Sequence, residues 1–585
     1  MKKIPLFQAL LLILFLLCTG GTAAEETPSF FSADDIFSKR DFRTEYKEEK
    51  AVSILLQGNS ASCMDPSVRI SGSTVTITKK GVYVLSGALE NGTIIIDAEK
   101  SDKVQLVLKG VSIHHNTFAP LYILQADKVF ITLAEGTENT LSNGGKFTSR
   151  DGNNVDGVIF SKEDLCLNGL GALSISSPAG HGVVSKDDLA VTGGNYQISA
   201  SGHALSGKDS LCIAGGNFQL DAGKDTLHAE HDEDAEKGFL YISDGSFLLS
   251  AQGDAVSASG KMQLDGGSFT LKTGNGPKET TRQDSFRGWQ MYSVPQADSP
   301  SRKALKASGE MILRGGEFMI QAEDDALHSN SDLYITGGNF TIATGDDGLH
   351  ADSALSVSGG NIRISQSYEG LEGQRIEISG GLIDLTASDD GLNAAGGKDQ
   401  SGISSPWGRD MFAVEENSYI SISGGKIMID AAGDGIDSNG HFYVSGGETY
   451  VSGPTGNGNG ALDFNGNAVI TGGSFLAAGS SGMAQSFSAD STQGVMLVSL
   501  NPSISMAPMK LTDNAGKEIF SWQSKKQFTF MVLSSPEIRQ NETYTLSMGN
   551  ESAPVTMEKL VYTLNQQQPG GPGRPGGPGG RPGRP

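Results

Sequence analysis

An acidic turn recurs along the middle of this 585-residue chain and is the pattern best suited to chemistry. Its clearest copies are Asp324-Asp325-Ala-Leu-His328, Asp346-Asp347-Gly-Leu-His350 and Asp389-Asp390-Gly-Leu-Asn393. Carboxylates stacked at neighbouring positions repel one another, so either their pKa values rise or a cation lies between them. Calcium takes six to eight oxygen ligands of this kind.

The acidic turns therefore predict a calcium site, with calcium as the expected cofactor. The candidate ligands are Asp324, Asp325, Asp346, Asp347, Glu369, Glu372, Asp389, Asp390, Asp434 and Asp437. The alternative is that Asp and Gly are simply favourable turn residues, which need no metal. Recurrence of the acids at one position through successive turns favours the cation.

Three histidines, His228, His328 and His350, follow an acid of the turn by three residues. We expect these rings to face outward beside the acids, where they could bind a transition metal. Solvated positions or contacts with sugar are the preferred interpretation. His328 and His350 are therefore candidate carbohydrate-binding residues.

Two long insertions beside the acidic turns carry aromatic residues. Trp289 and Tyr292 lie in residues 277–302, and Trp407 lies in residues 395–417. Aromatic rings on loops suit stacking against the apolar faces of sugar rings, so these three are candidate carbohydrate-binding residues. The alternative is that each tryptophan anchors its own loop.

A Gly-Gly doublet with constant flanks sets the frame for these turns, as at Gly315-Gly316, Gly337-Gly338 and Gly359-Gly360, about 22 residues apart. Apolar residues alternate before and after it, as at Leu333 and Ile335, which is the strand period. A short fixed period of strands and glycine corners is typical of a solenoid. The pattern predicts an all-β fold, a right-handed parallel β-helix in which equivalent positions stack into columns.

Composition restricts the partners of the chain. Residues 1–24 resemble a secretory signal peptide, although Cys18 leaves a lipoprotein alternative, and its apolar run is short for a membrane span. Without Lys2 and Lys3 the net charge falls from −23 to about −25, which argues against nucleic acid. We expect a secreted, extracellular protein that could associate with the cell surface or cell wall and has no transmembrane segment in the mature chain.

The expected organisation has five parts. They are the signal peptide 1–24, an N-terminal segment 25–67, the β-helix 68–493, a β-rich C-terminal cap 494–565 and a disordered Gly/Pro/Arg tail 566–585.

The chain resembles the secreted bacterial carbohydrate-binding domain-containing proteins with a pectate-lyase-like β-helix, across about residues 68–560. The residues that carry the resemblance are Gly81-Val-Tyr-Val-Leu-Ser-Gly87, Val104-Gln-Leu-Val-Leu-Lys-Gly-Val111, Ala119-Pro-Leu-Tyr-Ile123, 126–141, Asp346-Asp347-Gly-Leu-His-Ala351, Glu369-Gly-Leu-Glu372, Asp434-Gly-Ile-Asp-Ser438 and Ser534-Ser-Pro. The resemblance implies binding of cellulose or an acidic polysaccharide, calcium in the helix and an extracellular or cell-surface location.

Three functions remain open from the sequence. The first is a calcium-binding protein that recognises polysaccharide of the cellulose or polygalacturonate class and is not an enzyme. The second is a calcium-dependent polysaccharide lyase, in which a basic residue removes a proton. Arg287, Arg302 and Arg409 lie in insertions and could reach the acidic turns. The third is a structural or adhesive surface solenoid.

Overall fold

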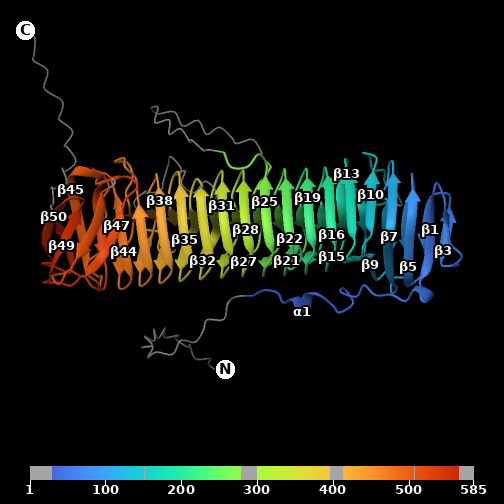
Figure 1. The fold of residues 1–585 in the computed structure, drawn as a ribbon, viewed down its shortest axis with the longest axis horizontal. Coiled ribbons are helices and arrows are strands. Elements are labelled where there is room, and N and C mark those ends of the chain that lie inside the picture. The colour runs from blue at the N-terminus through green and yellow to red at the C-terminus, as the bar shows by residue number, and fades with distance from the viewer. Residues whose placement is uncertain (1–28, 151, 279–299, 395–412, 506, 565–585) are drawn as a thin grey trace, which may run out of the picture.

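The computed structural model describes residues 29–150, 152–278, 300–394, 413–505 and 507–564. Strands stack along one axis into an elongated body, with β1 (Val52–Gly58) near one end and β44 (Ser474–Gly479) near the other (Figure 1). Each coil contributes three short strands, and each strand pairs in parallel with its counterpart in the next coil. The predicted all-β fold with parallel pairing is confirmed.

Three ladders result from this pairing. Ladder 1 runs through β4 (Thr74–Ile77), β6 (Thr93–Asp97), β8 (Leu121–Gln125), β11 (Gly157–Ser161), β14 (His181–Ser185), β17 (Leu205–Gly207), β20 (Leu227–Ala229), β23 (Val256–Ala258), β26 (Leu305–Ala307), β29 (Leu327–Ser329), β32 (Leu349–Val357), β34 (Leu371–Ile378), β36 (Leu392–Ala394), β39 (Ile436–Ser438) and β42 (Asp463–Phe464). Ladder 2 runs through β1, β5 (Gly81–Leu89), β7 (Lys103–His115), β9 (Lys128–Leu133), β12 (Asp164–Gly169), β15 (Asp188–Val191), β18 (Ser210–Ile213), β21 (Phe239–Ile242), β24 (Met262–Leu264), β27 (Met311–Leu313), β30 (Leu333–Ile335), the ends of β32 and β34, β37 (Tyr419–Ile422), β40 (His441–Val444) and β43 (Ala468–Ile470). Ladder 3 follows β7 with β10 (Glu138–Asn143), β13 (Ala172–Ser177), β16 (Asn195–Ala200), β19 (Asn217–Ala222), β22 (Ser246–Ala251), β25 (Ser268–Thr273), β28 (Glu317–Ala322), β31 (Asn339–Thr344), β33 (Asn361–Gln366), β35 (Leu382–Ala387), β38 (Lys426–Ala431), β41 (Glu448–Ser452) and β44.

The core lies between the three ladders. Strands of ladder 3 alternate exposed and buried residues, because successive side chains of a strand point to opposite faces. Phe318 and Phe340 stack with ring centroids 4.6 Å apart, within a row that continues through equivalent phenylalanines of earlier coils. Leu333, Ile335 and Ile342 are also buried, as the alternation predicted.

The Gly-Gly doublet has two separate physical causes. Its second glycine has a positive φ, for example +99° at Gly338, which L side chains rarely adopt. Except at Gly215, its first glycine packs against the preceding coil, and a Cβ on Gly337 would lie 2.5 Å from the carbonyl oxygen of Arg314. The doublet therefore allows the sharp corner and the close stacking of coils at once.

Beyond β44 the pairing becomes antiparallel. Strand β48 (Gln527–Ser534) pairs with both β44 and β45 (Val495–Ser505), and β45 pairs in parallel with β51 (Val561–Leu564). A separate antiparallel sheet contains β46 (Pro508–Thr512), β47 (Glu518–Gln523), β49 (Thr543–Met548) and β50 (Glu551–Thr556). At the other end, β2 (Ala61–Ser62) and β3 (Val68–Ser71) pair antiparallel with β1 and β4.

Residues 29–50, which we call the strap, run along the outside of ladder 2 (Figure 1). The strap contains the helix α1 (Ala33–Ile36) and a 3₁₀ turn (Glu48–Lys50). Its Phe31 ring stacks on Phe239, with centroids 4.7 Å apart. Within the described ranges, no helix has the length and hydrophobicity needed to cross a bilayer.

Candidate functional site

The predicted stacking of the acidic turns is confirmed residue by residue along ladder 1. Strand pairing places one residue of each coil in a single column, here called the strand column. Its members are His228, Ser257, Lys306, His328, His350, Glu372, Asn393, Asp437 and Asp463.

A second column, the turn column, lies three residues earlier in each coil, between ladders 3 and 1. Its members are Asp225, Asp254, Lys303, Asp325, Asp347, Glu369, Asp390 and Asp434. Most of its acids accept a hydrogen bond from the backbone N–H of the equivalent residue in the next coil. Asp254 N donates to Asp225 Oδ1 over 2.8 Å, and Glu369 N donates to Asp347 Oδ1 over 3.2 Å. Aspartate therefore joins successive coils at this position, a structural role that the sequence did not reveal.

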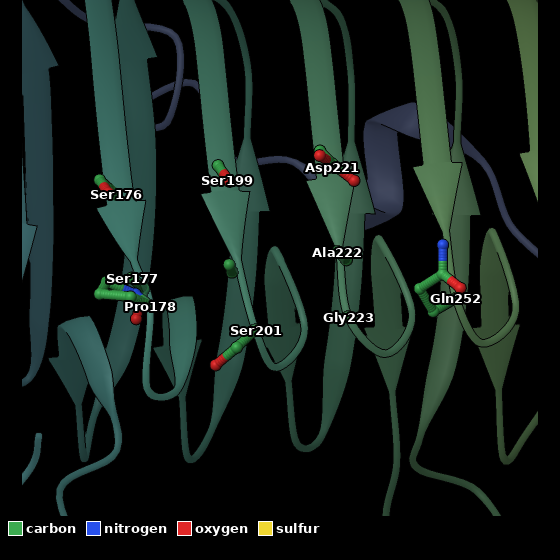
Figure 2. Close-up of a pocket in the computed structure, with 10 residues that line it drawn as sticks. Ser176, Ser177, Pro178, Ser199, Ser201, Asp221, Ala222, Gly223 and Gln252 are labelled. Atoms are coloured by element: carbon green, nitrogen blue, oxygen red, sulfur yellow. The ribbon is translucent and has the colours of Figure 1, made fainter. Parts of the chain in front are cut away.

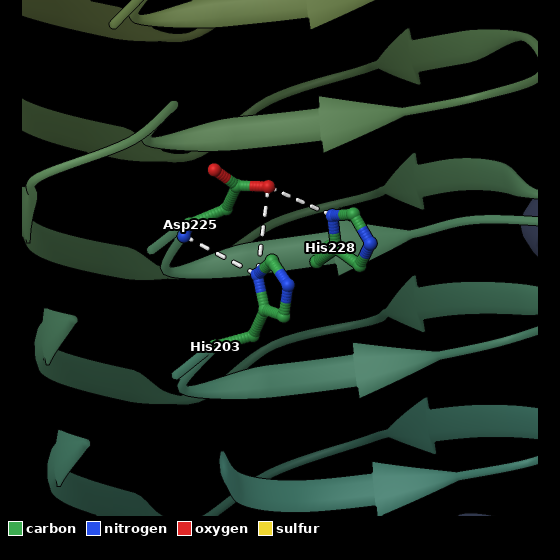
Figure 3. Close-up of side chains that lie close together, drawn as sticks. All are labelled: His203, Asp225 and His228. Atoms are coloured by element: carbon green, nitrogen blue, oxygen red, sulfur yellow. Dashed lines mark hydrogen bonds and ion pairs between the residues drawn. The ribbon is translucent and has the colours of Figure 1, made fainter. Parts of the chain in front are cut away.

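His203 occupies the turn position one coil before Asp225, and Asp225 contacts both this ring and His228 of the strand column (Figure 3). The N–H of Asp225 donates to Nδ1 of His203, and Oδ2 of Asp225 lies 2.8 Å from Nδ1 of His228. Burial lowers the pKa of His203 to about 3, whereas Asp225 and Glu230 outweigh burial and raise the pKa of His228 to about 9. The two rings stack with centroids 3.9 Å apart. In-plane lone pairs on parallel stacked rings cannot meet at one metal ion, so this arrangement argues against a shared metal here.

The next part of the turn column is neutralised within the protein. Lys303 Nζ lies 2.9 Å from Asp324 Oδ1 and also contacts Asp325. Although burial opposes it, Lys303 holds the pKa of Asp325 below its usual value, with help from His328 Nδ1 at 2.7 Å. Asp324 and Asp325 therefore already have cationic partners.

The following coils hold carboxylates that repel one another. We call Asp347, Glu369, Glu372, Asp389, Asp390, Asp434 and Asp437 the acidic array. Burial and neighbouring acids raise the pKa of Asp347, Glu369 and Asp390 well above the usual range. The same causes raise the pKa of Asp437 to about 8.

The acidic array has a histidine partner at one end and neutral partners beyond it. Asn393 Nδ2 donates to Glu369 Oε2 over 2.7 Å, and Tyr368 donates to Asp389. His350 Nδ1 lies 2.6 Å from Glu372 Oε2 and 3.5 Å from Asp347 Oδ2. Although burial opposes it, these acids and Asp352 raise the pKa of the His350 ring, so Asp347 and Glu372 share a cationic partner. One ligand atom from each of Asp347, His350 and Glu372 lies within 4.8 Å of the others. Among the described residues, no Lys, Arg or His forms an ion pair with Glu369, Asp390, Asp434 or Asp437. Buried carboxylates in this arrangement match the oxygen ligands of calcium.

The expected outward orientation of the histidines is wrong for His328 and His350. Their side chains are 3% and 0% exposed, because they lie between acids of adjacent coils and stack on each other at 4.5 Å. Both rings lie out of reach of a polysaccharide in this conformation. Trp289, Tyr292 and Trp407 lie outside the described residues.

The structure also contains a groove that the sequence did not predict. It crosses the ends of β13, β16, β19 and β22, has a volume of about 290 Å³ and opens beside the turn column (Figure 2). Its lining includes Ser176, Pro178, Ser199, Asp221 and Gln252. The alternation of exposed and buried residues in the sequence shows which of these side chains face outward. Only the pairing register of the strands brings them together into a groove.

Comparison with known proteins finds similarity in the first part of the described chain. The family model described as carbohydrate-binding domain-containing protein matches residues 71–348. The chain is similar to that family over these residues, which we call the family segment. The family segment ends just after Asp347 of the turn column, so most of the acidic array lies beyond it.

A carbohydrate-binding domain-containing protein of Acetivibrio thermocellus is 33% identical over 201 residues, which are 34% of this chain. The match spans 65% of that relative, slightly less than two thirds of its length. A solved structure of the polysaccharide lyase-like protein from C. thermocellum, a gadolinium derivative, is 30% identical. That comparison covers 38% of this chain and 92% of the other, with a TM-score of 0.38.

Proposed function

We propose that this protein is a secreted, calcium-binding protein that recognises polysaccharide and is not itself an enzyme. The family segment supports carbohydrate recognition. The single observation that carries the calcium is the acidic array, in which buried carboxylates face other carboxylates. A cation held there would remove a repulsion that protonation would otherwise have to relieve.

The calcium ligands would come from the coils that follow the ion-paired Lys303. Glu369, Asp390, Asp434 and Asp437 carry the side-chain oxygens that have no cationic partner among the described residues. Asp347 and Glu372, which His350 also contacts, extend the set. We place no calcium between Asp324 and Asp325, because Lys303 already occupies that position. Calcium bound at the array would also offer charge to the carboxylate of a uronate sugar, which would let an acidic protein bind an acidic glycan such as polygalacturonate.

Parallel three-ladder pairing supports a closed, right-handed β-helix as the scaffold, since parallel crossovers are strongly biased to that hand. An extracellular or cell-surface location is part of the same proposal, supported by the signal-like residues 1–24. Binding is favoured over lyase chemistry because the described basic residues nearest the columns are already ion-paired. Arg302 binds Glu323, Lys303 binds Asp324, and Lys306 lies 3.6 Å from Asp254.

Calorimetric titration with calcium and thermal melting test this proposal. We expect wild-type protein to bind calcium and to melt at a lower temperature in EGTA, because a ligand at 100 times its Kd stabilises the folded state by about 2.7 kcal/mol. The double variant Glu369→Gln/Asp390→Asn should lose the heat of binding and the EGTA effect. Asp490→Asn, which changes an exposed acid away from the array, should retain both.

Pull-down on insoluble polygalacturonate completes the test. We expect retention in calcium, release in EGTA and no release of unsaturated sugar. A wild-type protein with no heat of calcium binding and the same melt in EGTA would disprove the calcium site. Unsaturated product that depends on calcium would make the protein a lyase.

A further inference from the structure

The outer face of ladder 3 is unlike the acidic turns beside it. We call the outward side chains of β13, β16, β19, β22 and β25 the polar face. They are Ala172, Ser174, Ser176, Asn195, Gln197, Ser199, Asn217, Gln219, Asp221, Ser246, Leu248, Ser250, Ser268, Thr270 and Lys272. Asp221 and Lys272 are the charged members of this set, in a chain of net charge −23. A surface so poor in charge favours a neutral ligand.

Strand pairing arranges the polar face into straight columns. Ser174, Gln197, Gln219, Leu248 and Thr270 occupy one column, and the pairing contains no register shift from β13 to β25. Neighbouring positions in a column lie about 4.8 Å apart. The arrows of these strands lie side by side along the body (Figure 1). The face therefore offers amide and hydroxyl groups at a constant interval along the long axis.

The polar face offers both hydrogen-bonding groups and apolar side chains, the two kinds of contact that a protein makes with a sugar. The groove of about 290 Å³ lies along one edge of the face, where the ring of Pro178 joins Ser176 and Ser199 of the face (Figure 2). The exposed side chains of Leu248 (52%) and, one strand beyond, Met319 (56%) lie in the same column, with Thr270 between them. Hydroxyl and amide groups can bond sugar hydroxyls, and the aliphatic side chains can cover the apolar face of a pyranose ring.

We propose that the polar face binds a neutral polysaccharide chain, which runs from coil to coil along the long axis with one sugar in the groove. This inference rests on the proposed function, because it assumes that the family segment recognises carbohydrate. All members of the polar face lie within residues 71–348, whereas most of the acidic array does not. The neutral-glycan site is thus separate from the calcium-dependent one.

Binding of the full-length protein to insoluble cellulose and to polygalacturonate, each with calcium or EGTA, tests the separation. The variants Ser199→Arg and Leu248→Asp place a charge on exposed positions of the polar face. Thr386→Arg is the matched control, because Thr386 is an exposed outward residue of ladder 3 beyond the family segment. We expect both face variants to bind cellulose at least about tenfold more weakly, with wild-type melting temperatures and unchanged calcium-dependent binding to polygalacturonate. Thr386→Arg should bind both glycans as wild type does.

The outcomes distinguish this inference from the proposed function. Cellulose binding that is unchanged in both face variants overturns the polar face as the site. Wild-type protein that binds polygalacturonate but not cellulose also overturns it and leaves the proposed function standing. Wild-type protein that binds neither glycan overturns both. Cellulose binding that disappears in EGTA would assign the neutral glycan to the calcium site instead.

Discussion

Adjacent histidines of one stack are held in opposite charge states by their own partners. His203 accepts a backbone N–H at Nδ1, and burial keeps its ring neutral. His228 lies between Asp225 and Glu230, which favour its protonated form despite burial. Both rings are largely buried, so the difference arises from the two carboxylates that bind His228 and from the positive charge of His228 beside His203.

The pKa of His228 predicts a pH dependence of stability. Its folded pKa of about 9 exceeds the reference value of 6.5, so its contribution is complete below pH 6.5 and is lost as pH rises through about 9. We expect the melting temperature of His228→Gln to fall less than that of the wild type between pH 6.5 and 9. NMR titration should show the His228 ring still protonated at pH 7.5. A ring that titrates near pH 6.5 would contradict this assignment.

At the scale of the element, the corner of each coil depends on how closely coils approach. Gly337 packs against the carbonyl of Arg314, whereas a Cβ on Gly215 would meet nothing within 4 Å. Asp244 occupies the position of Gly215 one coil later, which shows that a side chain fits there. The first glycines of the doublets therefore differ in whether they can be replaced by a residue with a Cβ.

Matched alanine substitutions test this difference. Gly337→Ala should destabilise the protein by roughly 1–3 kcal/mol, because the new methyl group must displace backbone. Gly215→Ala should leave stability unchanged within roughly 0.5 kcal/mol. Because solenoids can open locally, the suitable measurement is hydrogen exchange of the amides in β27 and β30 for Gly337→Ala and in β15 and β18 for Gly215→Ala. Equal effects of the two substitutions would contradict the close-approach explanation.

At the scale of the whole molecule, the strap connects coils that are distant in sequence. The carbonyl of Asp41 accepts hydrogen bonds from Asn168 Nδ2 at 2.9 Å and Thr192 Oγ1 at 2.8 Å. The Asp41 carboxylate lies 2.8 Å from Lys128 Nζ. Beneath this segment lies Cys166, which is fully buried, and burial raises the pKa of its thiol.

Thiol labelling reports whether the strap is seated. In the native protein we expect a thiol reagent to modify the half-buried Cys63 and to spare Cys166 and Cys212. Phe31→Ser/Phe37→Ser removes the rings that pack on Phe239 and Tyr241, so it should expose Cys166 to labelling while far-UV dichroism stays the same. Mass spectrometry of labelled peptides gives the measurement. Continued protection of Cys166 in that variant would mean that the strap is held by its polar contacts.

Much of the candidate site could be predicted from the repeat. Once the coil length is known, pairing of equivalent residues follows, and the strand column from His228 to Asp463 has the pairing that the repeat predicts at each position. The same repeat places Ala190 between Cys166 and Cys212, and all three described cysteines are free thiols.

By itself, the sequence determined the strands, the glycine corners and the stacking of acids, because these depend on local periodicity. Tertiary structure decided which acids are neutralised and which are not, since Lys303 reaches Asp324 and Asp325 only when successive coils stack. It also buried His328 and His350, seated the strap on ladder 2 and formed the groove on ladder 3. Each of these depends on side chains from different coils meeting in space, and a repeat pattern carries the spacing of such residues but not their contacts.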